Sequence, residues 1–365
     1  MKMPTTVIRE EIQQSGAISF ARFMELALYC PETGYYESQK DNVGRAGDFI
    51  TSVSVGSLFG ELLACRFAGW LEVLKSDGSK LVIVEAGAHD GRLASDILAW
   101  LQLHRPELLD HIQYGILEPS PRRQVWQRER LKTFGSRVRW FTGFEDWKAQ
   151  GPRPAGIVFS NELLDAFPVH RLGWNAAEKK WFEWAVTLVA GEFAWTRLPA
   201  DRSAITFDLP LPLLDILPDN YTIETCPAAA NWWREAAGLF TRGKLLAIDY
   251  GFTDAEMVSP ARTRGTLRAY HNHHVSDDLL AHPGEQDLTA HVNFSAIQRA
   301  GEEAGLKTES FCTQPQFLTR ILEQGLKQNL FRGWSGKQTR QFQTLTHPEH
   351  LGRAFSVLIQ TRNQG

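Results

Sequence analysis

The chain has 365 residues, 43% of them hydrophobic and 22% charged, which is ordinary for a globular protein of one large or two modest domains. Its formal net charge of −3 gives no electrostatic signature of nucleic-acid binding. The four cysteines form no Cys-x-x-Cys pair, which argues against a structural zinc site and favours a reducing compartment. No stretch approaches about 18 uninterrupted apolar residues, and the N-terminal segment lacks an apolar signal core. We therefore expect a cytoplasmic protein without membrane insertion.

Residues 1–75 are expected to form an N-terminal helical region. Ser19 is a candidate N-cap, and the apolar side chains after it recur at helical spacing until Pro31. A second helix is expected over 55–74. The glycine-rich loop before it contains Asp48, which could close over a ligand or could only bond its own backbone in a turn.

Strands and helices alternate from residue 81 onward. Strands are predicted over 81–86, 114–118, 138–141, 157–161 and 243–250, with two more near 309–312 and 355–361, and a helix is predicted over 92–103. Such alternation predicts an α/β fold of the Rossmann-like type, with a mostly parallel, doubly wound sheet. We assign residues 76–168 and 241–365 to this domain, with a helical insertion at 320–350.

The alternation breaks between residues 169 and 240. Segments 180–188 and 192–198 flank a Val-Ala-Gly turn and are rich in aromatic and β-branched residues, as in a hairpin. A helix containing Trp232 and Trp233 follows. Because exposed aromatic side chains commonly mark partner surfaces, we interpret 169–240 as an inserted substrate region beside the ligand cleft.

The turn after the first strand of the sheet is the most informative motif. Gly87 and Gly91 would let the backbone approach a ligand, and the helix after them offers free N–H groups. Glu118 ends the next strand, where an acid would bind a ribose diol. The Gly-x-Gly-x-x-Gly pattern is absent, and the carboxylates of Glu85 and Asp90 suit a cationic ligand better than a pyrophosphate. The motif favours S-adenosylmethionine over NAD, although such a turn can also serve only to pack a helix on a strand.

Four blocks of the sequence together resemble the MidA family. They are Gly47-Asp-Phe-Ile-Thr-Ser52 with Phe59-Gly-Glu61, the turn Glu85–Gly91, Asn161-Glu-Leu-Leu-Asp165 with Pro168-Val-His170, and Pro283-Gly-Glu-Gln-Asp-Leu-Thr-Ala290. MidA proteins are class I S-adenosylmethionine-dependent methyltransferases of bacteria and mitochondria. The resemblance implies S-adenosyl-L-methionine as cofactor and methylation of an arginine on a partner protein, such as a subunit of respiratory complex I. The family turn usually reads Glu-x-Gly-Pro-Gly-x-Gly, and here Ala88 and His89 replace the proline and the middle glycine.

The expected cofactor site combines the turn, the strand ends and the N-terminal loop. Its predicted members are Asp48, Glu85, Gly87, Gly91, Glu118, Ser120 and Asn161. Glu118 is expected to bond the ribose hydroxyls, while Asp48, Glu85 and Gly87 face the methionine half. Ser120 also precedes Pro121 and is expected to cap the helix that follows.

The fourth predicted strand ends in residues that suit an arginine acceptor. A guanidinium is protonated in water, so a carboxylate must orient it and accept its proton. Glu162 and Asp165 are the candidate catalytic acids because they follow the strand end, where open α/β sheets bind ligands. Alternatively, both only cap the following helix. His170 could relay a proton, and Glu224 is either a second carboxylate for the guanidinium or an exposed strand residue.

Two other functions and one other site remain open at this stage. The chain could be an assembly or scaffold protein with little activity, or a methyltransferase for a small molecule, which would need a closed acceptor pocket. The histidines near 271–274 have no cysteine or paired acid beside them, so no metal site is expected. The oligomeric state is left open.

Overall fold

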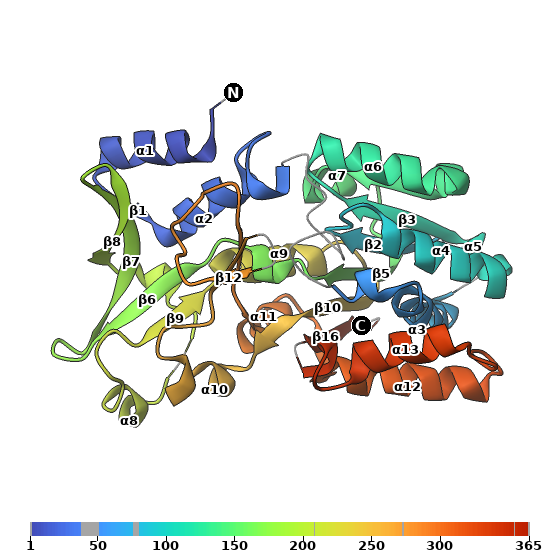
Figure 1. Cartoon of the computed structure of the whole chain (residues 1–365). Coiled ribbons are helices and arrows are strands. Elements are labelled where there is room, and N and C mark those ends of the chain that lie inside the picture. The colour runs from blue at the N-terminus through green and yellow to red at the C-terminus, as the bar shows by residue number, and fades with distance from the viewer. Residues whose placement is uncertain are drawn as a thin grey trace. The chain divides into compact units, whose positions relative to one another are not determined.

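The structure is a computed structural model that describes residues 2–37, 51–75, 80–207, 209–271, 274–353 and 355–363. It contains two compact units (Figure 1). The first comprises the described residues of 1–49, 164–231 and 250–297, and the second comprises those of 50–163, 232–249 and 298–365. The domain boundaries predicted at residues 75, 168 and 240 stay a prediction, and Asp48 lies outside the described residues.

The second unit contains the predicted sheet, with strand order β15-β16-β10-β5-β2-β3-β4. The strands are β2 (Leu81–Ala86), β3 (Ile112–Leu117), β4 (Val138–Phe141), β5 (Ala155–Asn161), β10 (Arg242–Phe252), β15 (Lys307–Thr313) and β16 (Phe355–Arg362). Strands β10, β5, β2, β3 and β4 pair in parallel, and β15 pairs antiparallel to β16. The predicted Rossmann-like class is confirmed.

The order of the strands locates the ligand-binding edge of this sheet. From β2 the chain proceeds to β3 and β4 on one side, and β5 then pairs on the other side of β2. This reversal is a topological switch point, and open α/β sheets bind ligands outside the carboxyl ends of the strands there. The segments after β2 and β5 are therefore the first place to look for a site.

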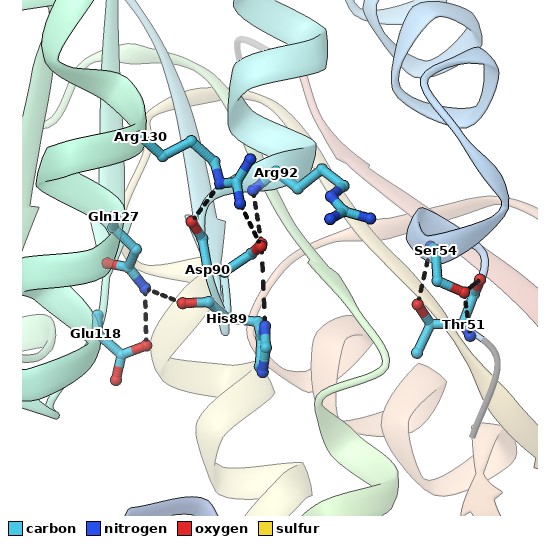
Figure 2. Close-up of polar contacts among 8 residues, drawn as sticks. All are labelled: Thr51, Ser54, His89, Asp90, Arg92, Glu118, Gln127 and Arg130. Atoms are coloured by element: carbon cyan, nitrogen blue, oxygen red, sulfur yellow. Dashed lines mark hydrogen bonds and ion pairs between the residues drawn. The ribbon is translucent and has the colours of Figure 1, made fainter. Parts of the chain in front are cut away.

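The helices of the second unit are α3 (Leu58–Leu74), α4 (Arg92–His104), α5 (Pro106–Leu109), α6 (Pro121–Leu131), α7 (Phe144–Lys148), α12 (Gln314–Lys327) and α13 (Gly336–Thr346), with parts of α9 (Pro227–Ala237) and α11 (Phe294–Glu303). Side-chain caps mark the start of α6, α12 and α13 among them. The side chain of Ser120 caps α6, and Gly91 precedes α4. The helix predicted from residue 55 begins only at Leu58, because the 3₁₀ turn Val53–Val55 and Gly56, with φ +148°, come first. Thr51 and Ser54 close that turn through reciprocal hydrogen bonds (Figure 2).

The first unit contains an antiparallel sheet built around the predicted hairpin. Its strands are β1 (Ile18–Ser19), β6 (His170–Asn175), β7 (Lys180–Val189), β8 (Glu192–Pro199) and β9 (Thr222–Thr225). Helices α1 (Pro4–Ser15) and α2 (Phe20–Tyr29) contribute to the same core, in which Phe20 packs beside Val186 and Trp195. Part of the aromatic content of the hairpin is therefore explained by core packing rather than by a partner surface.

The remaining elements of the first unit are short. They are α8 (Leu211–Leu214), α10 (Asp254–Met257), β14 (Val292–Asn293) and a small sheet of β11 (Arg268–His271), β12 (His274–Ser276) and β13 (Asp287–Thr289). Within the described ranges, no cluster of metal-ligating side chains occurs in either unit. No helix in the part of the chain that the structure describes is long and apolar enough to cross a bilayer.

Candidate cofactor and acceptor site

The turn after β2 is held by side chains of the neighbouring helix α6 (Figure 2). Gly87, His89 and Gly91 adopt positive φ angles of +74°, +45° and +80°. The Asp90 carboxylate accepts hydrogen bonds from Arg92 N (3.0 Å) and from Arg130 Nη2 (2.7 Å). Burial opposes ionisation of Asp90, but its bonds to His89 and Arg92 and the charge of Arg130 outweigh it and lower its pKa to about 2. Asp90 thus serves the turn itself, because its charge is already neutralised.

Glu85 is the carboxyl that remains for a cationic ligand at the end of β2. It is only 2% exposed and accepts a hydrogen bond of 2.5 Å from the Tyr114 hydroxyl. Burial raises the pKa of Glu85 to about 8, although the bond from Tyr114 opposes the shift. The φ of Gly87 favours glycine, and a Cβ there would also lie 2.9 Å from Leu163 Cδ1, so the leucine side chain would have to shift.

Glu118 follows β3 and is oriented from two sides. Its Oε1 accepts a bond from Ser120 N (2.9 Å), and its Oε2 accepts one from Gln127 Nε2 (3.1 Å). Glu118 is only 2% exposed, so its carboxylate is held in a buried position after β3. The side chain of Ser120, predicted to contact the cofactor, accepts from Arg123 N as the cap of α6.

A second acidic group occurs at the carboxyl ends of β5 and β10. Glu162 has φ +51°, and its Oε1 accepts hydrogen bonds from Ser52 N and Asn161 Nδ2, both at 3.1 Å. Burial outweighs these bonds and raises the pKa of Glu162 to about 8. Asp249, fully buried on β10, accepts a bond from Leu163 N at 3.1 Å. Asn161 Oδ1 is buried and has no hydrogen-bond partner among the described residues, so it can accept a bond from a ligand.

The loop that contacts Glu162 is anchored by the C-terminal helices. Ser52 Oγ donates to Gln314 Oε1 (3.1 Å), and Gln314 Nε2 donates to the Leu345 carbonyl (3.0 Å). Gln314 is fully buried at the start of α12, and Leu345 belongs to α13. Helices α12 and α13 therefore contribute to the placement of Glu162.

Glu162 does not cap a helix. Its carboxylate is bonded to Ser52 N–H and to Asn161, and only a three-residue 3₁₀ turn, Leu164–Ala166, follows. The alternative in which Glu162 is simply a capping residue is wrong on this geometry.

Two predicted catalytic residues belong to the first unit. Asp165 is 6% exposed, and its backbone carbonyl accepts from Ala290 N at 2.9 Å. His170 Nδ1 lies 2.7 Å from Glu183 Oε1 on the adjacent strand. Glu224 is buried rather than exposed. Its carboxylate accepts hydrogen bonds from Thr266 N at 2.7 Å and from Arg171 Nε at 3.4 Å. Its carboxylate already has an arginine partner within this chain.

The predicted site residues are thus divided between the units. Glu85, Gly87, Gly91, Glu118, Ser120, Asn161 and Glu162 belong to the second unit. Asp249, Ser52 and Gln127 were not predicted. Asp249 ends the apolar strand predicted over 243–250, so the reasoning that found Glu118 could have found it too.

Residues 62–312 match the model of a family of S-adenosyl-L-methionine-dependent methyltransferases. The chain belongs to this family. The resemblance to MidA proteins is confirmed, and this methyltransferase uses S-adenosyl-L-methionine as its cofactor. The residues of the second unit fit that cofactor, since an oriented acid follows β3 and a buried carboxyl ends β2 beside a glycine turn.

Known relatives span most of the chain. The protein arginine methyltransferase NDUFAF7, mitochondrial, of Danio rerio is 28% identical and covers 95% of this chain and 84% of its own length. Its Homo sapiens counterpart is 27% identical, with coverage of 97% and 83%. A crystal structure of a Burkholderia thailandensis protein bound to S-adenosyl-homocysteine superposes with a TM-score of 0.84 at 30% identity, covering 98% of this chain and 92% of that one.

The predicted cytoplasmic localisation is contradicted by these relatives, whose names place them in mitochondria. The prediction relied on unpaired cysteines and on the lack of an apolar signal core. Both properties fit any reducing compartment, so they could not distinguish the cytoplasm from the other reducing compartments of a cell.

Proposed function

We propose that this methyltransferase transfers its methyl group to an arginine side chain of a partner protein. The observation that carries the proposal is Glu162, a partly buried carboxyl with a raised pKa at the switch point of the sheet, in the same unit as the cofactor turn. The relatives named as protein arginine methyltransferases support the same acceptor. A subunit of respiratory complex I is the first candidate partner, as the family resemblance implies.

The proposed chemistry assigns separate acids to the two substrates. Bound S-adenosylmethionine supplies an electrophilic methyl group on a sulfonium. We assign Glu118 to the ribose hydroxyls and Glu85, with Gly87 and Gly91, to the methionine half. Glu162 would then orient the guanidinium and accept the proton that its nitrogen loses. The new N–C bond would form as the bond between sulfur and the methyl group breaks, and S-adenosylhomocysteine would leave with that electron pair. Asp48, Ser120, Asp165 and His170 stay candidates for supporting roles.

The environment of Glu162 suits a proton acceptor. Its raised pKa means that the carboxyl is largely protonated at neutral pH until a cation approaches. A guanidinium nearby favours the ionised form, so acceptor binding would itself generate the base. Ser52 N–H and Asn161 fix one oxygen and leave the other for the substrate.

Replacing Glu162 with glutamine tests the assignment. Glu162→Gln keeps the shape and removes the charge, so S-adenosylmethionine affinity should hardly change while turnover falls by at least the roughly 100-fold typical of losing a positioned acid or base. At saturating cofactor, kcat/KM of the natural protein should rise with pH and level off near the pKa of about 8, and the variant should lose this rise.

The assay follows labelled S-adenosylmethionine in lysate of a strain lacking the protein, with mass spectrometry to locate the methylated residue. The exposed acid Glu129 provides the control, because Glu129→Gln removes a charge outside the site. A Glu162→Gln variant that methylates its protein at the normal rate removes Glu162 from the mechanism. Label found only on small molecules contradicts a protein acceptor.

A further inference from the structure

Gln127 is a buried polar side chain on helix α6 that is hydrogen-bonded both to the turn after β2 and to Glu118 after β3 (Figure 2). Its Nε2 donates to Glu118 Oε2 at 3.1 Å and to the His89 carbonyl at 2.9 Å. Its Oε1 accepts from the indole N–H of Trp140 at 3.0 Å. One fully buried amide on α6 is therefore bonded to the acid after β3, the turn after β2 and strand β4.

The partners of Gln127 leave its amide a single orientation. An indole N–H can only donate, and a carboxylate and a carbonyl can only accept, so the oxygen must face Trp140 and the nitrogen the other two. Trp140 is restrained in turn, because the Arg128 guanidinium lies 4.2 Å from the centre of its ring. Both N–H groups of the Gln127 amide and its oxygen are thus hydrogen-bonded within the protein, and the side chain is fully buried.

We propose that Gln127 is a positioning residue of the cofactor site, which fixes the Glu118 carboxylate and the His89 carbonyl in one binding-competent arrangement. The proposal rests on the assignment of Glu118 to the ribose. Ser120 N–H holds one carboxylate oxygen, and the bond from Gln127 to the other oxygen restrains the rotation of the group. The same amide restrains the left-handed backbone at His89, so it links the ribose side to the methionine side.

Calorimetry with S-adenosylhomocysteine on the full chain tests this role without using turnover. Gln127→Met keeps the length of the side chain and removes its hydrogen bonds. Losing a bond to a charged group should weaken affinity about tenfold or more. Gln124 provides a matched control on the same helix, since its Nε2 donates to the backbone carbonyl of Glu118 rather than to the carboxylate. Gln124→Met should stay within about twofold of the natural protein, because a part-buried bond to a neutral carbonyl contributes less than a buried bond to a carboxylate.

Two measurements separate positioning from a merely structural effect. In a double-mutant cycle, Gln127→Met should cost much less affinity when Glu118→Ala is already present, because no carboxylate remains to be positioned. Gln127→Glu places a carboxyl beside Glu118, and two adjacent carboxyls share a proton only at low pH. Relative to the natural protein, this variant should bind well near pH 5.5 and progressively worse toward about pH 8.5.

The outcomes are decisive in both directions. Normal affinity of Gln127→Met, full additivity with Glu118→Ala, or a Gln127→Glu deficit that does not change with pH would each overturn the positioning role. Normal binding by Glu118→Ala, with the natural protein binding well, would instead show that the ribose assignment has failed. A folding defect is recognised separately, by measuring the melting temperature of each variant without ligand at each pH and comparing affinities only where the protein is folded.

Discussion

Glu85 and Glu162 lie at the ends of adjacent strands and share an unusual protonation state. Both have a pKa of about 8 because burial disfavours the charged form. A carboxyl of this kind stays neutral in the free protein and ionises when a cationic ligand approaches. Both ligands proposed for this site, an ammonium with a sulfonium and a guanidinium, are cations of that type.

The protonation of Glu85 should be visible in stability. Its folded pKa of about 8 exceeds its ordinary value of 4.5, so the folded state binds the proton more tightly. This contribution to the free energy of unfolding is complete below pH 4.5 and is lost as pH rises through about 8. Glu85→Gln cannot ionise, so its stability should fall less over that window in denaturant titrations.

The control for this measurement is the exposed Glu129, whose replacement by glutamine should leave the pH dependence as it is. If the curves of Glu85→Gln and the natural protein run parallel from pH 5 to about 8.5, the carboxyl is ionised throughout and burial does not govern it.

The site residues predictable from the sequence are those that end apolar strands. Glu85, Glu118 and Glu162 could be identified because a charged residue directly after a buried strand has few structural reasons to be there. Gln127 could not be identified, since in sequence it is one polar residue among many on a charged helix. Its role depends on how α6 docks, which only tertiary structure determines.

Among the secondary-structure elements, the buried parallel strands were predicted best. The bounds of β2 and β4 agree with the prediction, because turns on both sides of a short apolar run leave little choice of where the strand begins and ends. Strands β6 and β9 were not predicted. Strand β9 pairs with β6, which is distant in sequence. Strand β6 is joined to β7 by the short turn 176–179, but that turn contains no glycine, proline or asparagine to mark it. The start of α3 was placed three residues early because the 3₁₀ turn at Val53–Val55 continues the same apolar pattern.

Helix α12 should influence catalysis through the loop that it anchors. Gln314→Leu removes the acceptor of Ser52 Oγ and the donor to the Leu345 carbonyl, so the loop bonded to Glu162 loses its restraint. We expect turnover to fall about tenfold, because loosened positioning weakens acid–base catalysis, while cofactor affinity stays unchanged.

Gln316 on the same helix is the matched control. Its side chain completes the capping box of α12, so Gln316→Ala should lower stability by about 1 kcal/mol without a comparable loss of turnover. Equal losses of turnover in the two variants would mean that the helix acts only through general stability.

On the scale of the whole molecule, each compact unit is assembled from three separate chain segments. Hydrophobic periodicity is local, so it could find the hairpin of β7 and β8 and the helix after Ser19 separately. It could not show that α1 and α2 share the core of the hairpin. For the same reason, removing the hairpin to test substrate binding would open that core. Point substitutions are the better tool for this unit.

The left-handed backbone at Glu162 has a consequence for how the protein can be stabilised. A non-glycine residue with φ +51° carries a conformational cost of order 1–3 kcal/mol. The desolvation that raises the pKa of the Glu162 carboxyl adds a further cost to the folded state. Glu162→Gly should therefore raise the melting temperature while abolishing turnover. Lys179→Gly, at φ +50° in an exposed turn, should gain stability without losing activity. A lower melting temperature for Glu162→Gly would show that its hydrogen bonds outweigh the strain. If the melting temperature rises instead, a selection for heat resistance alone would discard the residue that we propose as the proton acceptor.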